Sequence, residues 1–396
     1  MQDNEKLDLV LERFYQRFNK YNTKVLKKIG EAIKQIGEVS PSEVYQLGQQ
    51  LKYGIELDEL LDELARISGK SVLDVDRLLD RVAEENVDFA EKYYKAKNKE
   101  FVDYKNNEPL QRYVESIKQE TYGTFKNLAN STNVGFTLKD QNGNTIFKPF
   151  KDAYRDVIDE GIYNVTSGVK DYQSAMRNVI NQLADSGVKI HEESVAYRSG
   201  YNRRIDSSVR QNILEGVRKV NIGIQEQIGN EIGADGVEVS HHENCSPDHY
   251  EIDGKQFTKE KFEKVNSNLT RPVGMLNCYH FAFSIVLGID EPMFSKERLK
   301  KDIEENEKGF EFEGKHYTNY EGTQLMRKIE LSLRQQKDRQ IIARSSGDKE
   351  GILKAQNKIS QLTNKYNELL KISGLPSAIQ RASVTGYRRV SVNKLK

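Results

Sequence analysis

Four of the six histidines of this chain, and both of its cysteines, lie in one short stretch. In chain order they are His241, His242, Cys245, His249, Cys278 and His280. Neutral imidazole and thiolate are the ligands that zinc prefers in proteins. Two short loops would supply four such ligands, Cys245, His249, Cys278 and His280, with His242 as a further candidate. The first interpretation of this stretch is therefore a zinc site.

The spacing of these residues leaves two other interpretations open. A zinc ribbon carries paired Cys-x-x-Cys ligands, which are missing here, and a single residue separates Cys278 from His280. Buried cysteines can instead pack as small apolar side chains, while histidines brace loops through polar contacts. A disulfide between Cys245 and Cys278 is the third interpretation. Of the three, the residues favour the structural role.

Two kinds of metal enzyme use similar residues, and neither pattern is complete. Zinc deaminases need His-x-Glu followed by Pro-Cys-x-x-Cys, and the neighbourhood of His242-Glu243 lacks both that spacing and the second half. In a His-Asn-His nuclease, Asp248-His249 could supply the base, but only two residues separate Asn277 from His280. No P-loop and no nucleophile elbow occurs. We therefore expect no enzymatic activity, with a metal-dependent nuclease as the alternative.

Helices are expected on both sides of this stretch. Apolar residues recur at helical spacing near the start of the chain, at Leu7, Leu11, Phe14, Phe18, Val25 and Ile29. Ser40-Pro41-Ser42-Glu43 and Ser71-Val72-Leu73-Asp74 have the residues of helix starts. Phe136-Thr137-Leu138 and Ile146-Phe147 flank Asn142-Gly143, which predicts a β-hairpin.

These patterns predict a mainly α protein with a small, loop-rich α+β unit. The expected regions are a helical N-terminal region, 1–130, a mixed and mostly helical region with a hairpin, 131–235, a small His/Cys-containing α+β unit, 236–290, and C-terminal helices with a basic tail, 291–396. The N-terminal part is expected to be elongated and the middle unit compact. Ser345-Ser346-Gly347-Asp348 separates two charged helical stretches, so the C-terminal part is expected to form a helical hairpin.

The charge of the chain is balanced. Lys and Arg number 61 and Asp and Glu 60, so a net charge of +1 excludes a polycation that coats DNA unaided. The segment from Lys371 to Lys396 is basic without an acidic residue, which fits either a solvated tail or a contact with DNA or an acidic partner. No stretch approaches the roughly 20 apolar residues of a membrane span. Two cysteines fit a reducing cytoplasm during synthesis.

One ordered series of short motifs is similar to a known family. His242-Glu243-Asn244-Cys245-Ser246-Pro247-Asp248-His249 is followed by Asp253-Gly254-Lys255-Gln256-Phe257 and by Leu276-Asn277-Cys278-Tyr279-His280. The series resembles the phage minor capsid protein 2 family, a relative of the wider head-morphogenesis proteins. The resemblance covers Tyr197 to Tyr387. It departs from the family at Tyr279, where Arg is frequent, and at Arg271-Pro272-Val273-Gly274, where the Gly/Pro-rich approach is reduced.

The resemblance implies a structural minor head protein of a tailed phage. Such a protein would act in head assembly, with the portal protein and the major capsid protein as partners, or stay associated with packaged DNA. It would be found in the virion, in the capsid interior or at the portal vertex, after synthesis in the host cytoplasm. The residues expected to hold the small unit together, in structural or metal-binding roles, are Asp248, His249, Gly254, Asn277, Cys278 and His280.

Overall fold

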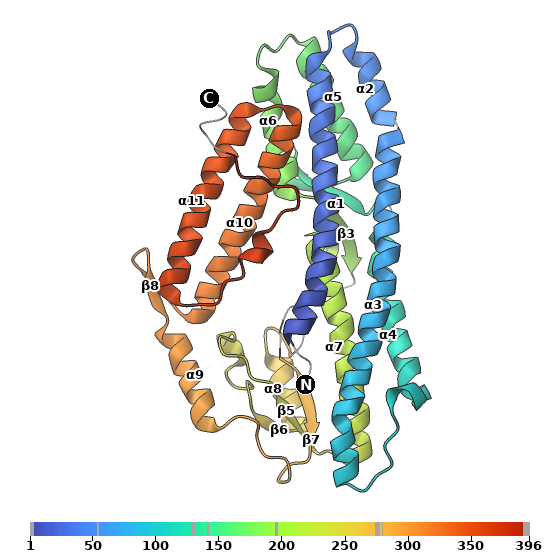
Figure 1. Cartoon of the computed structure of the whole chain (residues 1–396), viewed down its shortest axis with the longest axis vertical. Helices are drawn as coiled ribbons and strands as arrows, with labels where there is room; N and C mark the ends of the chain where they lie inside the picture. Colours follow the sequence, from blue (N-terminus) through green and yellow to red (C-terminus); the bar gives the residue numbers. More distant parts are fainter. Residues whose placement is uncertain are drawn as a thin grey trace.

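The protein is described by a computed structural model over residues 4–53, 55–128, 132–140, 142–194, 197–273, 278 and 280–390. Within these residues it is an elongated, mainly α molecule with small antiparallel sheets (Figure 1). The long helices run along the longest axis, and a small sheet unit lies at one end. The predicted fold class, mainly α with a small α+β unit, is confirmed.

The N-terminal part consists of long amphipathic helices. They are α1 (Asn4–Glu38), α2 (Val44–Tyr53), α3 (Ile55–Ala96), the 3-10 helix η1 (Tyr104–Asn106) and α4 (Glu108–Leu128). From Leu11 to Ile29 the predicted stripe on α1 is buried, since these residues recur on one helical face. The helix start predicted at Ser71 is wrong. Its hydroxyl donates to the carbonyl of Ile67 within an uninterrupted α3, instead of capping a new helix.

The next part combines helices with a four-stranded sheet. Its elements are β1 (Val134–Lys139), β2 (Thr145–Pro149), α5 (Phe150–Thr166), α6 (Tyr172–Ser186), β3 (Lys189–Ser194), β4 (Tyr197–Arg204) and α7 (Ile205–Ile232). The strand order is β2-β1-β3-β4, with antiparallel pairing throughout. The predicted β1–β2 hairpin is confirmed, and Gly143 takes the positive φ of +83° that its turn needs.

One apolar core joins these helices and the sheet. Side chains of α1 and α3 to α7 meet those of β1 and β3, and Ile342 of a later helix joins them. Helices α1, α3 and α4 all pack against α7, and α1 also packs against α2, α5 and α6. This core draws on both of the first two predicted regions, and the four-region division of the chain stays a prediction.

A small unit follows α7 and has an apolar core of its own. It contains β5 (Gly236–Val239), the 3-10 helix η2 (Pro247–His249), β6 (Gln256–Thr258), α8 (Lys259–Asn268) and β7 (Ala282–Ile285). The strand order β6-β5-β7 is antiparallel. The core is formed by Val239, Ile252, Phe257 and Val273. So small a core stabilises little by itself, which makes polar contacts in its loops important.

The C-terminal part is a helical hairpin preceded by a short β-hairpin. Its elements are α9 (Lys296–Lys308), β8 (Phe310–Phe312), β9 (Lys315–Tyr317), α10 (Asn319–Ser346), α11 (Lys349–Ser373) and the 3-10 helix η3 (Ile379–Ala382). Gly347 ends α10 with φ +81°, and the side chain of Asp348 caps α11 by accepting from the backbone N–H of Gly351. The predicted helical hairpin is confirmed.

The segment after α11 packs against the long helices up to residue 390. The backbone N–H of Thr385 donates to Asn19 of α1 at 2.8 Å, and Thr23 donates to the Thr385 carbonyl at 2.8 Å. Ala382 is fully buried. The solvated tail that the sequence allowed is therefore wrong for this segment, and residues 391–396 lie outside the described residues. None of the described helices has both the length and the apolar character needed to cross a membrane.

Candidate functional site

The His/Cys-bearing loops meet because of the strand order in the small unit. Val239 at the end of β5 pairs with Ala282 at the start of β7, and Glu238 pairs with Gln256 at the start of β6. The loop from β5 to β6 and the loop that enters β7 therefore lie at the same edge of the sheet. A backbone hydrogen bond of 2.8 Å from Ser240 to Phe281 ties the two loops together.

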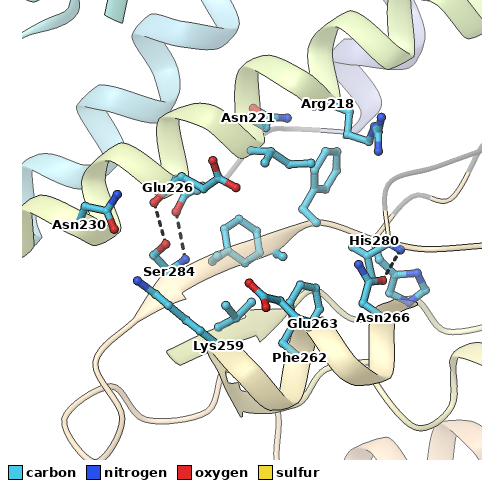
Figure 2. A pocket seen from close by; sticks show the side chains of 17 residues that line it. Arg218, Asn221, Glu226, Asn230, Lys259, Phe262, Glu263, Asn266, His280 and Ser284 are labelled. Carbon is cyan, nitrogen blue, oxygen red and sulfur yellow. Dashed lines mark hydrogen bonds between the residues drawn. The ribbon is translucent and has the colours of Figure 1, made fainter. Parts of the chain in front are cut away.

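A cavity of about 430 Å³ lies between this unit and helix α7 (Figure 2). Arg218 and Glu226 of α7 line it on one side, and Lys259 and Glu263 of α8 on the other. His280 borders one end. The lining mixes charges of both signs with aromatic rings, so the cavity has no dominant charge that would select a strongly anionic or cationic ligand.

Asp253 lies at the centre of the polar contacts between the loops. Its Oδ1 accepts from His280 Nε2 at 2.9 Å and from the backbone N–H of His242 at 2.8 Å. Its Oδ2 contacts His241 Nδ1 at 2.6 Å. The other nitrogen of His241, Nε2, contacts Asp302 of α9 at 2.9 Å. One carboxylate thus connects both loops and, through His241, helix α9.

The charges in this cluster stabilise one another. Asp253 and His280 are each 3% exposed. Burial alone would raise the pKa of Asp253, but contacts with His241, His280 and the His242 backbone N–H lower it well below the usual range. Burial opposes the charged form of His280, yet Asp253, Cys245 and Cys278 raise its pKa to about 11. In this cluster the charged forms of both groups are therefore favoured, the Asp253 carboxylate and the His280 imidazolium.

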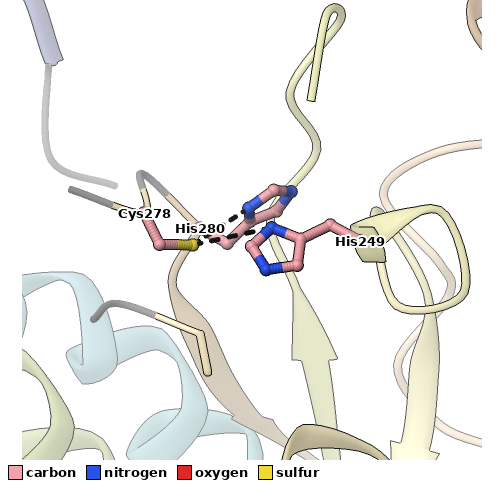
Figure 3. Close-up of side chains that lie close together, drawn as sticks. All are labelled: His249, Cys278 and His280. Carbon is pink, nitrogen blue, oxygen red and sulfur yellow. Dashed lines mark hydrogen bonds between the residues drawn. The ribbon is translucent and has the colours of Figure 1, made fainter. Parts of the chain in front are cut away.

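His249, Cys278 and His280 converge on one point (Figure 3). Cys278 Sγ lies 3.3 Å from His280 Nδ1 and 3.9 Å from His249 Nδ1. The two imidazole rings are nearly perpendicular, with centroids 4.9 Å apart. His249 Nε2 lies 2.8 Å from the Arg271 carbonyl oxygen, so this nitrogen carries a proton and donates. The Nδ1 atoms of both histidines face the sulfur.

Cys245 is buried, but it belongs to a neighbouring group. The ligand atoms of Cys245, Asp253 and His280 lie within 4.8 Å of one another, and so do those of His249, Cys278 and His280. The two groups share His280. Both cysteines are described, and no disulfide joins them, so the third interpretation of the sequence is wrong. The four predicted ligands thus fall into two overlapping groups.

The remaining predicted residues lie around this cluster. The His242 ring packs edge-on against His280, with centroids 4.8 Å apart. Gly254 has φ +67°, and a Cβ there would lie 2.5 Å from a methyl carbon of Leu299, which explains the glycine. Asp248 lies in η2, where its buried Oδ1 has no hydrogen-bond partner among the described residues. Asn277 lies outside the described residues.

Sequence reasoning did not assign roles to three residues that complete the cluster. These are His241, Asp253 and, on α9, Asp302. Asp253 stood in the quoted Asp253-Gly254-Lys255 motif, and buried histidines commonly donate to a carboxylate. That rule could have singled out Asp253. No local signal pointed to Asp302, because it meets His241 only through the packing of α9 on the small unit.

Comparisons with known proteins agree with the resemblance of the short motifs. Neither a search of curated proteins nor a search of solved structures found a match. A model of one protein family, described as phage minor capsid protein 2, matches residues 3–371, which is nearly the whole chain. The match extends far beyond the His/Cys stretch and includes the long N-terminal helices. The chain belongs to the phage minor capsid protein 2 family.

Proposed function

We propose that this minor capsid protein has a structural role in assembly of the phage head and performs no catalysis. The observation that carries the proposal is the way Asp253 and His241 join two loops and α9 in one buried set of contacts. Such contacts hold a small unit rigidly at one end of an elongated helical body, as a structural part requires. We further propose the portal protein and the major capsid protein as partners, and the capsid interior or portal vertex as location.

Purified phage heads provide the direct test of this role. We expect mass spectrometry to detect the chain in DNA-filled heads, and we expect a tagged copy to retain the portal or major capsid protein on a column. A matched preparation from a phage lacking this gene serves as the control. Normal numbers of complete, infectious heads without the chain would contradict a role in assembly.

The nuclease alternative needs a separate assay. His249 is 3% exposed, and its Nε2–H donates to a backbone carbonyl, so this imidazole is poorly placed to activate water. We expect no cleavage of double-stranded DNA by the purified chain with Mg²⁺, Mn²⁺ or Zn²⁺. Cleavage that disappears in His249→Ala, but persists in a control variant of the exposed His316, would overturn the structural proposal.

We also propose that the C-terminal segment contacts packaged DNA. Arg388 and Arg389 are exposed on the packed C-terminal segment, which makes them the described cations best placed for phosphate contacts in this segment. Replacing both with Gln should weaken DNA binding and flatten its salt dependence, since each lost phosphate contact lowers the slope by about 0.9. Truncation would be a poor test, because this segment packs on α1. An unchanged salt slope would exclude these arginines.

A further inference from the structure

We propose that His249, Cys278 and His280 bind a zinc ion through His249 Nδ1, Cys278 Sγ and His280 Nδ1. On one tetrahedral zinc, with Zn–S about 2.3 Å and Zn–N about 2.0–2.1 Å, a sulfur and a nitrogen lie about 3.6 Å apart. The Sγ to Nδ1 distances of 3.3 and 3.9 Å lie on either side of that value. Both sulfur–nitrogen distances therefore fit ligands that share an ion, and all three ligand atoms lie within 4.8 Å of one another.

The outer contacts of both histidines prepare their Nδ1 atoms to bind a metal. His249 Nε2–H donates to the Arg271 carbonyl, and His280 Nε2 is held by the Asp253 carboxylate at 2.9 Å. These contacts keep the proton on Nε2 of each ring, so zinc would have to displace only a proton on Nδ1, and each imidazole would then bind the ion through that nitrogen. An ion at this point would bind two nitrogens and one thiolate, a donor set typical of zinc. Asp253 is then a positioning residue.

The neighbouring group of Cys245, Asp253 and His280 is less suited to hold the ion. Both oxygens of Asp253 already accept hydrogen bonds, from His280 and the His242 backbone at Oδ1 and from His241 at Oδ2. Binding zinc through Asp253 would break these contacts between the loops. Binding through Cys278 leaves them in place, so the geometry favours the group that contains Cys278.

A nucleophilic cysteine is the competing arrangement. Cys278, His280 and Asp253 stand in line as thiol, imidazole and orienting carboxylate, which are the parts of an activated thiol. Such a nucleophile needs one base. Here a second imidazole, His249, also turns its Nδ1 toward the same sulfur. Convergence of two imidazoles on one thiol is explained by a metal and not by nucleophilic catalysis.

Zinc content of the full-length chain tests the proposal, and the two cysteines supply a matched pair of variants. The chain should be purified without a polyhistidine tag from zinc-supplemented cells and analysed for metal. We expect about one zinc per chain in the unmodified protein and in Cys245→Ser. Loss of most zinc is expected in Cys278→Ser, His249→Gln and His280→Gln, while His316→Gln, an exposed histidine outside the site, retains it.

A variant could lose weakly bound zinc during purification. Titration with cobalt, followed by absorption spectroscopy, measures metal binding directly in that case. Co²⁺ added to metal-free protein should give a thiolate-to-cobalt charge-transfer band that Cys278→Ser abolishes and Cys245→Ser retains. Circular dichroism checks that the helices remain, since most helical residues lie outside the small unit. Asp253→Asn should keep the band but weaken zinc affinity 10- to 100-fold, because second-shell partners orient the ligands.

Four results would overturn the assignment. The first is a fully folded protein that takes up neither zinc nor cobalt. The second is a Cys278→Ser variant that retains zinc. The third is loss of zinc from Cys245→Ser, which would place the ion in the neighbouring group or require all four predicted ligands. The fourth is rapid iodoacetamide alkylation of Cys278 that added zinc does not slow, which would identify a nucleophilic thiol. None of these results depends on the role in head assembly.

Discussion

At the scale of single residues, the small unit depends on one buried carboxylate. Asp253 is 3% exposed and accepts from three groups that belong to both loops. Hydrogen bonds to a charged group stabilise more than neutral ones, about 1.5–3 kcal/mol each. Among the described residues of the unit, the apolar core contains few buried side chains, so these bonds contribute much of its stability.

Asp253→Asn should therefore destabilise the small unit by about 3 kcal/mol. The amide keeps one acceptor oxygen but turns an N–H₂ group toward existing donors, and the negative charge that balances His280 is lost. Asp302→Asn is the matched control, because Asp302 is partly exposed and contacts only the outer nitrogen of His241 in this cluster. It should cost about 1 kcal/mol.

Hydrogen exchange of the β5 and β7 amides measures how much each of the two substitutions destabilises the small unit, because exchange reports local opening separately from global unfolding. Faster exchange should be confined to the small unit, with the amides of α3 and α4 unchanged. Equal effects of the two substitutions would show that Asp253 is not the central contact.

At the scale of elements, the short β8–β9 hairpin sets the direction in which the chain enters α10. Gly309 ends α9 with φ +47°, and Glu313 and Gly314 form the turn with φ +50° and +74°. The Thr318 side chain then caps α10, and the Glu321 carboxylate accepts a hydrogen bond from the Thr318 backbone N–H in a capping box. Turn and cap residues thus specify this junction locally.

Two glycines at this junction, one before the hairpin and one in its turn, should differ in how much an alanine destabilises the protein. A Cβ at Gly309 would lie 1.9 Å from the Tyr317 carbonyl oxygen, whereas a Cβ at Gly314 meets nothing within 4 Å. Both positions have positive φ, so backbone strain makes alanine at either cost about 1–3 kcal/mol. Gly309→Ala should destabilise the protein by about 2 kcal/mol more than Gly314→Ala, because the backbone at Tyr317 must move to make room for the methyl group. Urea unfolding of both variants checks the order. Equal costs would mean that the hairpin adjusts freely.

At the scale of the whole molecule, a buried group of charges attaches the C-terminal hairpin to the helical body. Arg204, the last residue of β4, donates to Asp338 of α10 through two nitrogens at 3.1 Å each. Arg334 of α10 pairs with Asp206 of α7. Asp338 and Asp206 are 0% and 1% exposed. Each carboxylate of this group lies beside an arginine, so the four buried charges compensate one another.

Asp338→Ala should destabilise the protein by about 3–5 kcal/mol, because two buried arginines, Arg204 and Arg334, would then share the single carboxylate of Asp206. Asp185→Ala is the control. It also removes an ion pair between helices, with Arg339 of α10, but that pair is about one third exposed and should contribute about 1 kcal/mol or less. Thermal unfolding of the two variants makes the comparison, and similar melting temperatures would contradict a special role for the buried group.

Local patterns in the sequence predicted much of the fold. The amphipathic stripe of α1, the turn at Asn142-Gly143 and the break at Gly347-Asp348 all act over a few residues, and all are confirmed. Strands β3 and β4 were not predicted. Tyr197–Arg204 has no clear alternation of apolar and polar residues, and β4 forms only by pairing with β3. Pairing of that kind depends on distant parts of the chain.

The candidate site, like the fold, was predicted only in part from the sequence. Residue types and order identified the His/Cys stretch and the family, since both are properties of the linear chain. Only the folded structure separated Cys245 from the group of Cys278, placed Asp253 between the loops and brought Asp302 to His241. These contacts follow from the order β6-β5-β7 and from the packing of α9. Strand order and helix packing arise from burial of apolar surface across the whole unit, which no short motif encodes.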